Sequence, residues 1–282
     1  MPEIRTRALI LRSFDQGESD RILHLYTEQT GRVSAVAKGA RRSRRRFPGT
    51  LEILTVIDAR LADPPRSQLM RLEGARVLRP FESLVQQLGR YAVGCQLLEL
   101  LDRLTGEREA SPELFTFAVG VLDVLREETP DRLFALLVLT KTIARLGYRP
   151  QLASCSSCGR ELHPGSRGTG FEPRHGGAVC SDCREGEGFA ISARLLAALE
   201  QGIRSPLRER GGLGLGPRDV GRLELLIDRF FHFHIGIDLR STAFLRQVLT
   251  PGAVDAGRAR GDNAPALEGG RAPVPGAPLE QS

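Results

Sequence analysis

Four of the five cysteines in the chain fall in two short pairs, Cys155-Ser-Ser-Cys158 and Cys180-Ser-Asp-Cys183. Four thiolates with this spacing are typical of a tetrahedral zinc site, because each CxxC turn brings two thiolates to one ion. The gap between the pairs is slightly longer than the usual gap of about 15–20 residues. Since four thiolates leave no open position on the ion, we predict a structural zinc rather than a catalytic one. Two redox-active CxxC pairs are the alternative, but they lack a thioredoxin-like βαβ context.

The segment around these cysteines, residues 151–189, is mostly polar and shows no helical periodicity. Such a segment buries too little apolar surface to order itself, so we expect zinc binding and its folding to be one event. His163 and His175 lie in the same segment and are alternative ligands. The fifth cysteine, Cys95, falls on the apolar face of an expected helix, where a buried and unreactive thiol is the simplest interpretation.

A second candidate site is the run Lys-Gly-Ala-Arg-Arg-Ser-Arg-Arg-Arg at residues 38–46, in which six of nine side chains are cationic. No acidic residue occurs from Gln29 to Thr50. This density of charge cannot be buried, and guanidinium groups bind phosphate oxygens through paired hydrogen bonds. We therefore predict a nucleic-acid contact surface made of Lys38, Arg41, Arg42, Arg44, Arg45, Arg46 and Phe47. Phe47 either stacks on a base or fills the core of the domain. A solvated surface or a localisation signal is the alternative for the run.

The excess positive charge is confined to the first third of the chain. Residues 1–79 hold 16 Lys and Arg against 9 Asp and Glu, whereas the rest of the 282 residues hold 24 against 25. This asymmetry indicates a polyanionic partner, either nucleic acid or an anionic membrane surface. Because the basic run lies between two expected strands of a barrel, we favour nucleic acid and expect no membrane partner.

Composition and missing motifs exclude several classes of protein. No stretch approaches the roughly 18 apolar residues of a transmembrane helix, and the charged first residues do not read as a secretory signal. Five cysteines are too few for a disulfide scaffold. We therefore expect a cytoplasmic protein. The sequence has no Ser-His-Asp order, no paired catalytic carboxylates and no phosphate-loop lysine, so we predict that it is not an enzyme.

Two further motifs do not indicate a site. His232 and His234 are two residues apart, and on a helix such side chains point in nearly opposite directions, so they do not form a metal-binding pair. The glycine-rich run Gly211–Gly216 matches no phosphate-binding pattern and follows no expected strand.

The elements that must position these residues change character at Pro80. Before it, alternating apolar residues predict five strands at residues 4–14, 21–27, 32–37, 51–61 and 69–78. Five short strands separated by Gly and Pro favour an OB-fold barrel. After it, apolar residues at steps of three and four predict helices over 81–104, from Ser111 to about 126, from Thr129 to Leu146, and over 192–203, 217–236 and 241–249.

The expected fold class is therefore α+β, with three regions. Residues 1–79 form an OB-fold nucleic-acid-binding domain, and residues 80–250 form an α-helical bundle that carries the zinc finger at 151–189. Residues 251–282 are rich in Gly, Pro and Ala. Because this composition buries little apolar surface, we expect a disordered tail.

Several motifs, in this order, resemble the bacterial recombination mediator family RecO. They are Gly17-Glu-Ser-Asp-Arg-Ile-Leu, Thr27-Glu-Gln-Thr-Gly31, Ala35-Val-Ala-Lys-Gly-Ala-Arg-Arg42, Gly147-Tyr-Arg-Pro150, the two CxxC pairs and the helix Arg229–Gly236. The resemblance covers roughly residues 1–250, and only part of the family carries the cysteine quartet.

The resemblance implies an OB-fold followed by a helical domain with a zinc finger. It also implies binding of single- and double-stranded DNA, annealing of complementary strands, and action with RecR to load RecA on DNA coated by single-strand-binding protein (SSB). RecF and RecA are implied as indirect partners, and the nucleoid as the place of action. Lys38, Arg41 and Arg42 match the family motif, whereas Arg44, Arg45 and Arg46 extend it by charge alone.

Three alternatives stay open at this point. One is an OB-fold and zinc-finger protein that binds RNA. Another is a nuclease, which would need a carboxylate site that the sequence does not reveal. The third is an interaction scaffold, which would leave the basic run solvated.

Overall fold

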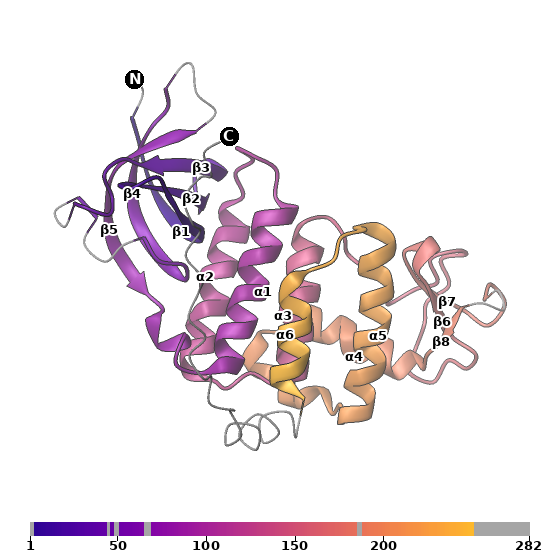
Figure 1. Ribbon diagram of the computed structural model, residues 1–282. Helices are drawn as coiled ribbons and strands as arrows, with labels where there is room; N and C mark the ends of the chain where they lie inside the picture. The colour runs from indigo at the N-terminus through magenta and orange to yellow at the C-terminus, as the bar shows by residue number, and fades with distance from the viewer. Residues whose placement is uncertain (1–2, 44–45, 48–50, 65–68, 185–187, 251–282) are drawn as a thin grey trace, which may run out of the picture. The chain divides into compact units, whose positions relative to one another are not determined.

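The computed structural model describes residues 3–43, 46–47, 51–64, 69–184 and 188–250. The expected disordered tail at 251–282 and the candidate DNA contacts Arg44 and Arg45 therefore lie outside the described residues. Within them the chain is α+β, with an N-terminal barrel followed by helices and a small sheet-containing module (Figure 1).

Five strands close the OB-fold barrel in the order β1-β2-β3-β5-β4. Their bounds are β1 Glu3–Gln16, β2 Asp20–Thr27, β3 Gly31–Ala37, β4 Thr55–Ala62 and β5 Met70–Pro80. All pairs are antiparallel except β3 and β5, which meet briefly through Ala35 with Met70 and Val36 with Arg71. The alternating apolar residues fill the barrel interior, as the sequence predicted.

Two elements begin four or more residues later than the sequence predicted. The fourth strand begins at Thr55 rather than residue 51, because the backbone of Leu54 has a positive φ of 59° that ends extended structure there. The first long helix begins at Leu88 rather than residue 81, since the short 3-10 helix η1 (Glu82–Leu84) comes first.

Six α-helices follow the barrel in the described residues: α1 Leu88–Leu104, α2 Pro112–Glu127, α3 Arg132–Arg145, α4 Ala193–Arg204, α5 Pro217–His234 and α6 Arg240–Leu249. The 3-10 helix η3 (Leu207–Leu213) joins α4 to α5. Ser111, Asp131 and Ser192 each cap a helix by accepting a backbone N–H bond on the side chain.

The cysteine-rich segment forms a small module between α3 and α4. It holds a sheet of order β7-β6-β8, built from β6 Gly170–Glu172, β7 Gly177–Val179 and β8 Phe189–Ala190, with the 3-10 helix η2 (Pro173–His175) between β6 and β7. The ring of Phe171 in β6 meets Phe230 of α5 edge-on, with 6.1 Å between ring centres. The module is thereby packed onto the helices.

Residues 1–250 form one compact unit. Leu9, Leu11 and Tyr26 of the barrel belong to the same apolar core as the helices, and His24 lies 2.7 Å from the Asp102 carboxylate of α1. The division at residue 79 into a barrel domain and a helical domain stays a prediction about how the two parts would fold alone. Over the described residues, no helix is both long and apolar enough to cross a membrane.

Candidate nucleic-acid interface and metal centre

The basic run forms a loop that leaves the end of β3, and we call residues 38–47 the basic loop. Gly39 has a positive φ of 64°, which lets the chain turn sharply there. The N–H groups of Arg42 and Ser43 then donate to the carbonyl of Gly39 at 3.2 and 3.1 Å. The side chains of Arg41 and Arg42, which follow this turn, are exposed.

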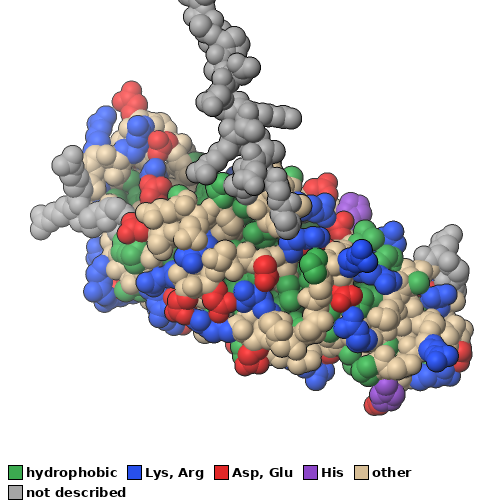
Figure 2. All heavy atoms as spheres, turned by 90° about the horizontal axis from the view of Figure 1, so that it is seen from below, with side chains coloured by type: hydrophobic (Ala, Val, Ile, Leu, Met, Phe, Trp, Pro, Cys, Tyr) green, Lys and Arg blue, Asp and Glu red, His purple; other side chains and the backbone are tan. Residues whose placement is uncertain are grey.

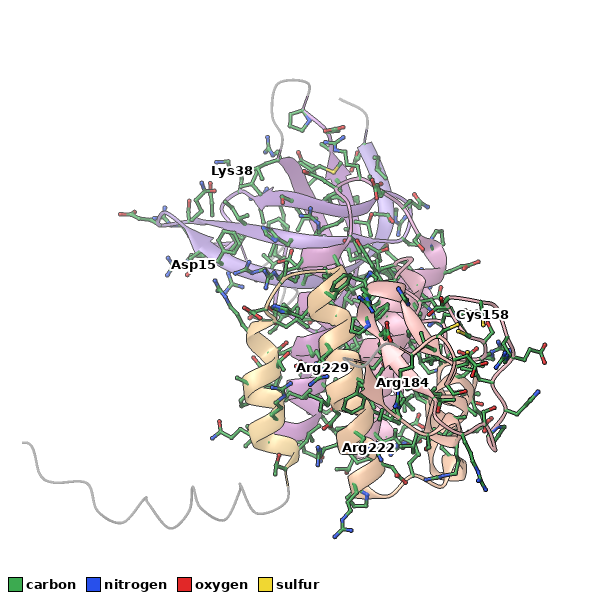
Figure 3. All side chains as sticks on the ribbon, turned by 90° about the vertical axis from the view of Figure 1, so that its right-hand side faces the viewer. Asp15, Lys38, Cys158, Arg184, Arg222 and Arg229 are labelled. Carbon is green, nitrogen blue, oxygen red and sulfur yellow. The ribbon has the colours of Figure 1, made fainter. Side chains whose placement is uncertain are left out.

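Asp20, at the start of β2, anchors the basic loop. Its carboxylate accepts a hydrogen bond from the Lys38 ammonium at 2.7 Å and another from the N–H of Gly39 at 2.8 Å. These two donors lower the pKa of Asp20 to about 2. Lys38 is thus committed in part to holding the loop, while Figure 3 shows it at the edge of the barrel.

Two arginines of the loop have long-range acidic neighbours that the local sequence did not suggest. Arg41 lies 3.6 Å from Asp15, and Arg42 lies 3.5 Å from Glu18, both on the β1–β2 hairpin. All four side chains are exposed, and pairs of this kind contribute at most about 1 kcal/mol. A phosphate group can therefore displace these carboxylates at little cost.

Arg46 and Phe47 play different roles from the ones that the sequence suggested. Phe47 is only 6% exposed and belongs to the barrel core, so its ring is not available to stack on a base. The alternative of a core residue is the one that the structure shows, because the loop returns over the barrel at this point. Arg46 covers the ring, with its guanidinium 5.3 Å from the ring centre, and donates to the carbonyl of Lys38 at 2.6 Å.

The structure adds three arginines that sequence analysis missed. Arg5 of β1, Arg60 of β4 and Arg76 of β5 line a shallow hollow together with Arg46, and Asp58 is the one carboxylate among its described lining residues. The strand register produces this meeting, since Arg5 pairs with Arg60 across β1 and β4, and Asp58 pairs with Arg76 across β4 and β5. Each arginine occupies an outward position of its strand, but only the register reveals that they adjoin.

The four cysteines of the two CxxC pairs come together as predicted. Their Sγ atoms lie within 4.8 Å of one another, and those of Cys158 and Cys180 are 3.8 Å apart. Zinc–thiolate bonds of about 2.3 Å in a tetrahedron place sulfur atoms roughly 3.8 Å apart, so this cluster fits a zinc ion. No other group of three or more metal-binding side chains occurs among the described residues.

Backbone geometry favours a thiolate at Cys155. The N–H of Gly159 donates to the carbonyl of Cys155 at 2.8 Å, and the N–H of Arg184 donates to that of Cys180 at 3.0 Å, so both pairs sit in similar turns. Burial opposes ionisation of Cys155, but backbone N–H groups of Cys158, Cys180 and Ser157 outweigh it and lower the pKa of this thiol to about 6.

The two histidines of this module lie outside the cluster. His163 is exposed and lies 4.0 Å from Glu161, whereas His175 faces the buried carboxylate of Glu172 at 3.5 Å. The four-thiolate set is thus the group that the described residues bring together.

Comparison with known proteins places the chain in a family. A family model described as recombination protein O N terminal matches residues 1–81, and one described as recombination protein O C terminal matches residues 85–243. The chain belongs to the recombination protein O (RecO) family. The two models meet at η1, where the barrel gives way to helices.

Relatives of this RecO-family chain support the same assignment over most of its length. A DNA repair protein RecO from Myxococcus xanthus is 36% identical over 248 residues, which cover 86% of this chain and 96% of that protein. Proteins of the same name from Anaeromyxobacter sp. strain K and Pelobacter propionicus are each 33% identical, covering 88% and 86% of this chain and 98% and 96% of theirs. A role in DNA repair and recombination follows for this RecO-family chain.

The remaining sequence candidates are structural in this RecO-family chain. His234 makes a 2.7 Å hydrogen bond with the carbonyl of Pro173, which locks α5 onto the cysteine module instead of forming a metal site with His232. The glycine-rich run forms the end of η3 and the turn into α5. Cys95 is half-buried on α1, and burial raises the pKa of its thiol, which keeps it unreactive.

Proposed function

We propose that this RecO-family chain is a recombination mediator that binds single- and double-stranded DNA and anneals complementary strands. With RecR, it would help to load RecA on single-stranded DNA coated by SSB. The observation that carries the proposal is the meeting of Arg46 from the basic loop with Arg5, Arg60 and Arg76 from three strands of an OB-fold barrel. This arrangement offers several guanidinium groups to one phosphate backbone.

Annealing needs no covalent chemistry on this surface. Two strands repel each other through their phosphates, and the arginines of the basic loop and the barrel hollow lower that repulsion by neutralising both backbones. Lys38 keeps the loop attached to the barrel through Asp20. Arg41 and Arg42 leave their exposed carboxylate partners and bind phosphate groups of the DNA instead. The process requires neither a nucleotide nor a catalytic residue, and contacts to phosphates carry no base information, so binding is largely non-specific.

The metal has a supporting role in this mechanism. Cys155, Cys158, Cys180 and Cys183 would hold a zinc ion, which supplies a cross-link between the two CxxC turns. No step of strand pairing involves these residues, because the thiolates would occupy all four positions on the ion.

The test is a strand-annealing assay on SSB-coated oligonucleotides, comparing the wild-type chain with a variant in which the arginines at 41–46 are alanine. We expect at least a tenfold loss of annealing rate, because the variant loses most of the charge on the basic loop. If about five phosphates are neutralised, a plot of the logarithm of duplex affinity against the logarithm of salt concentration has a slope near −4 to −5. We expect this slope to be less steep for the 41–46 variant. The matched control replaces five exposed, ion-paired arginines outside the basic loop, namely Arg79, Arg103, Arg149, Arg204 and Arg208.

Two results would contradict this function. An unchanged salt slope in the 41–46 variant would place the DNA surface elsewhere, and a requirement for ATP hydrolysis would refute annealing by charge neutralisation. Tighter binding to structured RNA than to single-stranded DNA in competition would support the RNA-binding alternative. The same proposal makes SSB and RecR direct partners, RecF and RecA indirect ones, and the cytoplasmic nucleoid the site of action.

A further inference from the structure

A second group of arginines surrounds the two-residue strand β8, next to α5. Arg222 donates a hydrogen bond to the carbonyl of Ala190 at 2.8 Å, and the guanidinium of Arg229 lies 5.2 Å from the centre of the Phe189 ring. Both side chains are exposed. Figure 3 shows them on the same side of α5. Strand β8 therefore contacts the guanidinium groups of both side chains.

Arg184 borders the same strand from the cysteine module. A Cβ atom at Gly170 would lie 2.6 Å from the Cδ atom of Arg184, and one at Gly188 would lie 3.2 Å from its Cγ atom. Glycine at both positions thus leaves room for this arginine to lie across the sheet beside Arg222 and Arg229 (Figure 3).

The cationic face continues along α5. At 100° per residue, Arg218, Arg222, Arg229 and Phe233 fall within an arc of roughly 60° and span about 22 Å of helix. Phe233 is 59% exposed, the largest exposed fraction among the large apolar side chains in the described part of the chain. We call these four residues the α5 surface.

The acidic residues of α5 do not neutralise this surface. Asp219 lies 3.1 Å from Arg194, Glu224 binds Arg132, and Asp228 lies 2.9 Å from Arg246. Each carboxylate is thus paired with an arginine of another element. Arg218, Arg222 and Arg229 form no ion pair with any described residue, whereas most arginines in the described ranges do. Figure 2 shows blue and red side chains interspersed over the face that it presents.

We propose that the α5 surface binds the backbone of a second nucleic-acid strand, with Phe233 stacking on a base. Single-strand binders combine phosphate-binding cations with exposed aromatic rings in this way. The inference rests on the proposed annealing function and extends it, since annealing requires that two strands be held at once. Strands β1 and β2 pack against α1, whereas α5 packs against α3, α4 and η2, so different layers of the fold carry the two surfaces.

The shape of the α5 surface favours a nucleic-acid backbone over an acidic peptide. A hollow between α5 and α6 is lined by Glu224, Asp228 and residues of α6, and it includes none of the four residues of the α5 surface. An acidic peptide with apolar anchor residues needs an apolar pocket beside the arginines that bind its carboxylates. A row of arginines on a convex helix suits an extended phosphate backbone instead.

The experiment compares the wild-type chain with the triple variant Arg218→Ala, Arg222→Ala, Arg229→Ala. One measurement is the salt dependence of affinity for a labelled single strand, and the other is the annealing rate of two labelled strands by energy transfer. We expect the salt slope to become less steep by about 2, at roughly 0.7 per lost single-strand phosphate contact, and the annealing rate to fall at least tenfold. Replacing Arg149, Arg204 and Arg208 removes the same charge from paired positions that do not contact α5 carboxylates, and should leave both readouts unchanged.

If the triple variant disorders strand β8, two single variants still test the inference. Arg218→Glu reverses a charge near the start of α5, where an acidic residue favours the helix, so reduced annealing cannot come from helix loss. Phe233→Ala removes an exposed ring and should slow annealing several-fold without changing the salt slope.

Three outcomes separate this inference from the proposed function. Normal annealing and an unchanged slope in the triple variant, with annealing lost in the 41–46 variant, would overturn the inference alone. If the triple variant loses binding to a poly-glutamate peptide but keeps DNA binding, the α5 surface binds an acidic protein, and this result would also overturn the inference. Failure of the wild-type chain to anneal strands would instead overturn the proposed function.

Discussion

At the scale of single residues, the basic loop shows how one carboxylate can organise a cationic segment. Asp20 accepts hydrogen bonds from Lys38 and Gly39, so it fixes the first turn of the loop, while Arg41, Arg42 and Arg46 are exposed. A run of like charges alone would repel itself into an extended chain. Asp20 thus fixes the position of the turn that precedes the arginines of the basic loop.

Protonation of Asp20 should release this attachment. Its pKa in the folded chain, about 2, lies below the ordinary value near 3.9, so the attachment is complete above about pH 4 and is lost as the pH falls towards 2. Replacing Lys38 with Met removes the stronger donor, and we expect the midpoint of the Asp20 carboxyl titration, followed by NMR, to rise. It should stay below the ordinary value because the Gly39 N–H remains.

The matched control is Arg42→Met, which removes a neighbouring cation that pairs with Glu18 rather than Asp20. An Asp20 titration midpoint that is equally low in wild type and Lys38→Met would show that the Lys38 contact does not hold the loop.

At the scale of elements, the cysteine module is too small to be stable through its own strands. β6 and β7 have three residues each and β8 has two. Sheets of this size are at best marginal in water, so the cysteine cluster and the contact of Phe171 with Phe230 must supply the stability. The module in turn supports Arg222 and Arg229 through β8.

Removal of the metal should therefore unfold the module selectively. With a strong chelator, or with Cys158→Ser, we expect trypsin to cleave within 151–189 at least tenfold faster, while amide exchange in the barrel strands stays unchanged. Structural zinc sites contribute about 10–16 kcal/mol of apparent binding free energy in small peptides, which exceeds what these short strands can replace.

Cys95→Ser is the control for this prediction, because Cys95 lies on α1 outside the cluster. Equal protease sensitivity of 151–189 with and without metal would mean that packing on α5 alone holds the module.

At the scale of the whole molecule, the β2–β3 turn joins the barrel to the helices. Gly31 has a positive φ of 74°, and a Cβ atom there would lie 2.0 Å from the carbonyl oxygen of Glu109 in the α1–α2 connection. Next to it, Arg32 donates to the carbonyl of Thr105 at 3.1 Å and accepts a backbone bond from Arg108 at 2.9 Å. The two parts of residues 1–250 therefore meet backbone to backbone at this glycine.

Gly31→Ala should weaken the whole unit. The positive φ costs roughly 1–2 kcal/mol in a residue with a Cβ, and the overlap with Glu109 adds about 1–3 kcal/mol, so we expect the free energy of unfolding in denaturant to fall by about 2–5 kcal/mol.

Gly17→Ala is the matched control, since Gly17 has a similar φ of 60° but no atom within 4 Å of the added Cβ. It should cost only the conformational part, roughly 1–2 kcal/mol. Equal losses in the two variants would show that the Gly31 contact contributes nothing to the joining of barrel and helices.

The sequence by itself determined the features that depend on local pattern. Alternating apolar residues located the five strands, steps of three and four located the helices, and the spacing of two CxxC pairs located the cysteine cluster, because each of these signals is written within a few dozen neighbouring residues. Ser111 was predicted as a helix start for the same reason.

Only the tertiary structure decided which distant side chains share a surface. The register of β1, β4 and β5 brought Arg5, Arg60 and Arg76 to Arg46, and the packing of the module on α5 brought strand β8 to Arg222 and Arg229. Phe47 became a core residue because the loop returns over the barrel. Strand register and packing are set by the burial of the whole core. The sequence around a charged surface residue therefore does not show which distant residues will lie beside it.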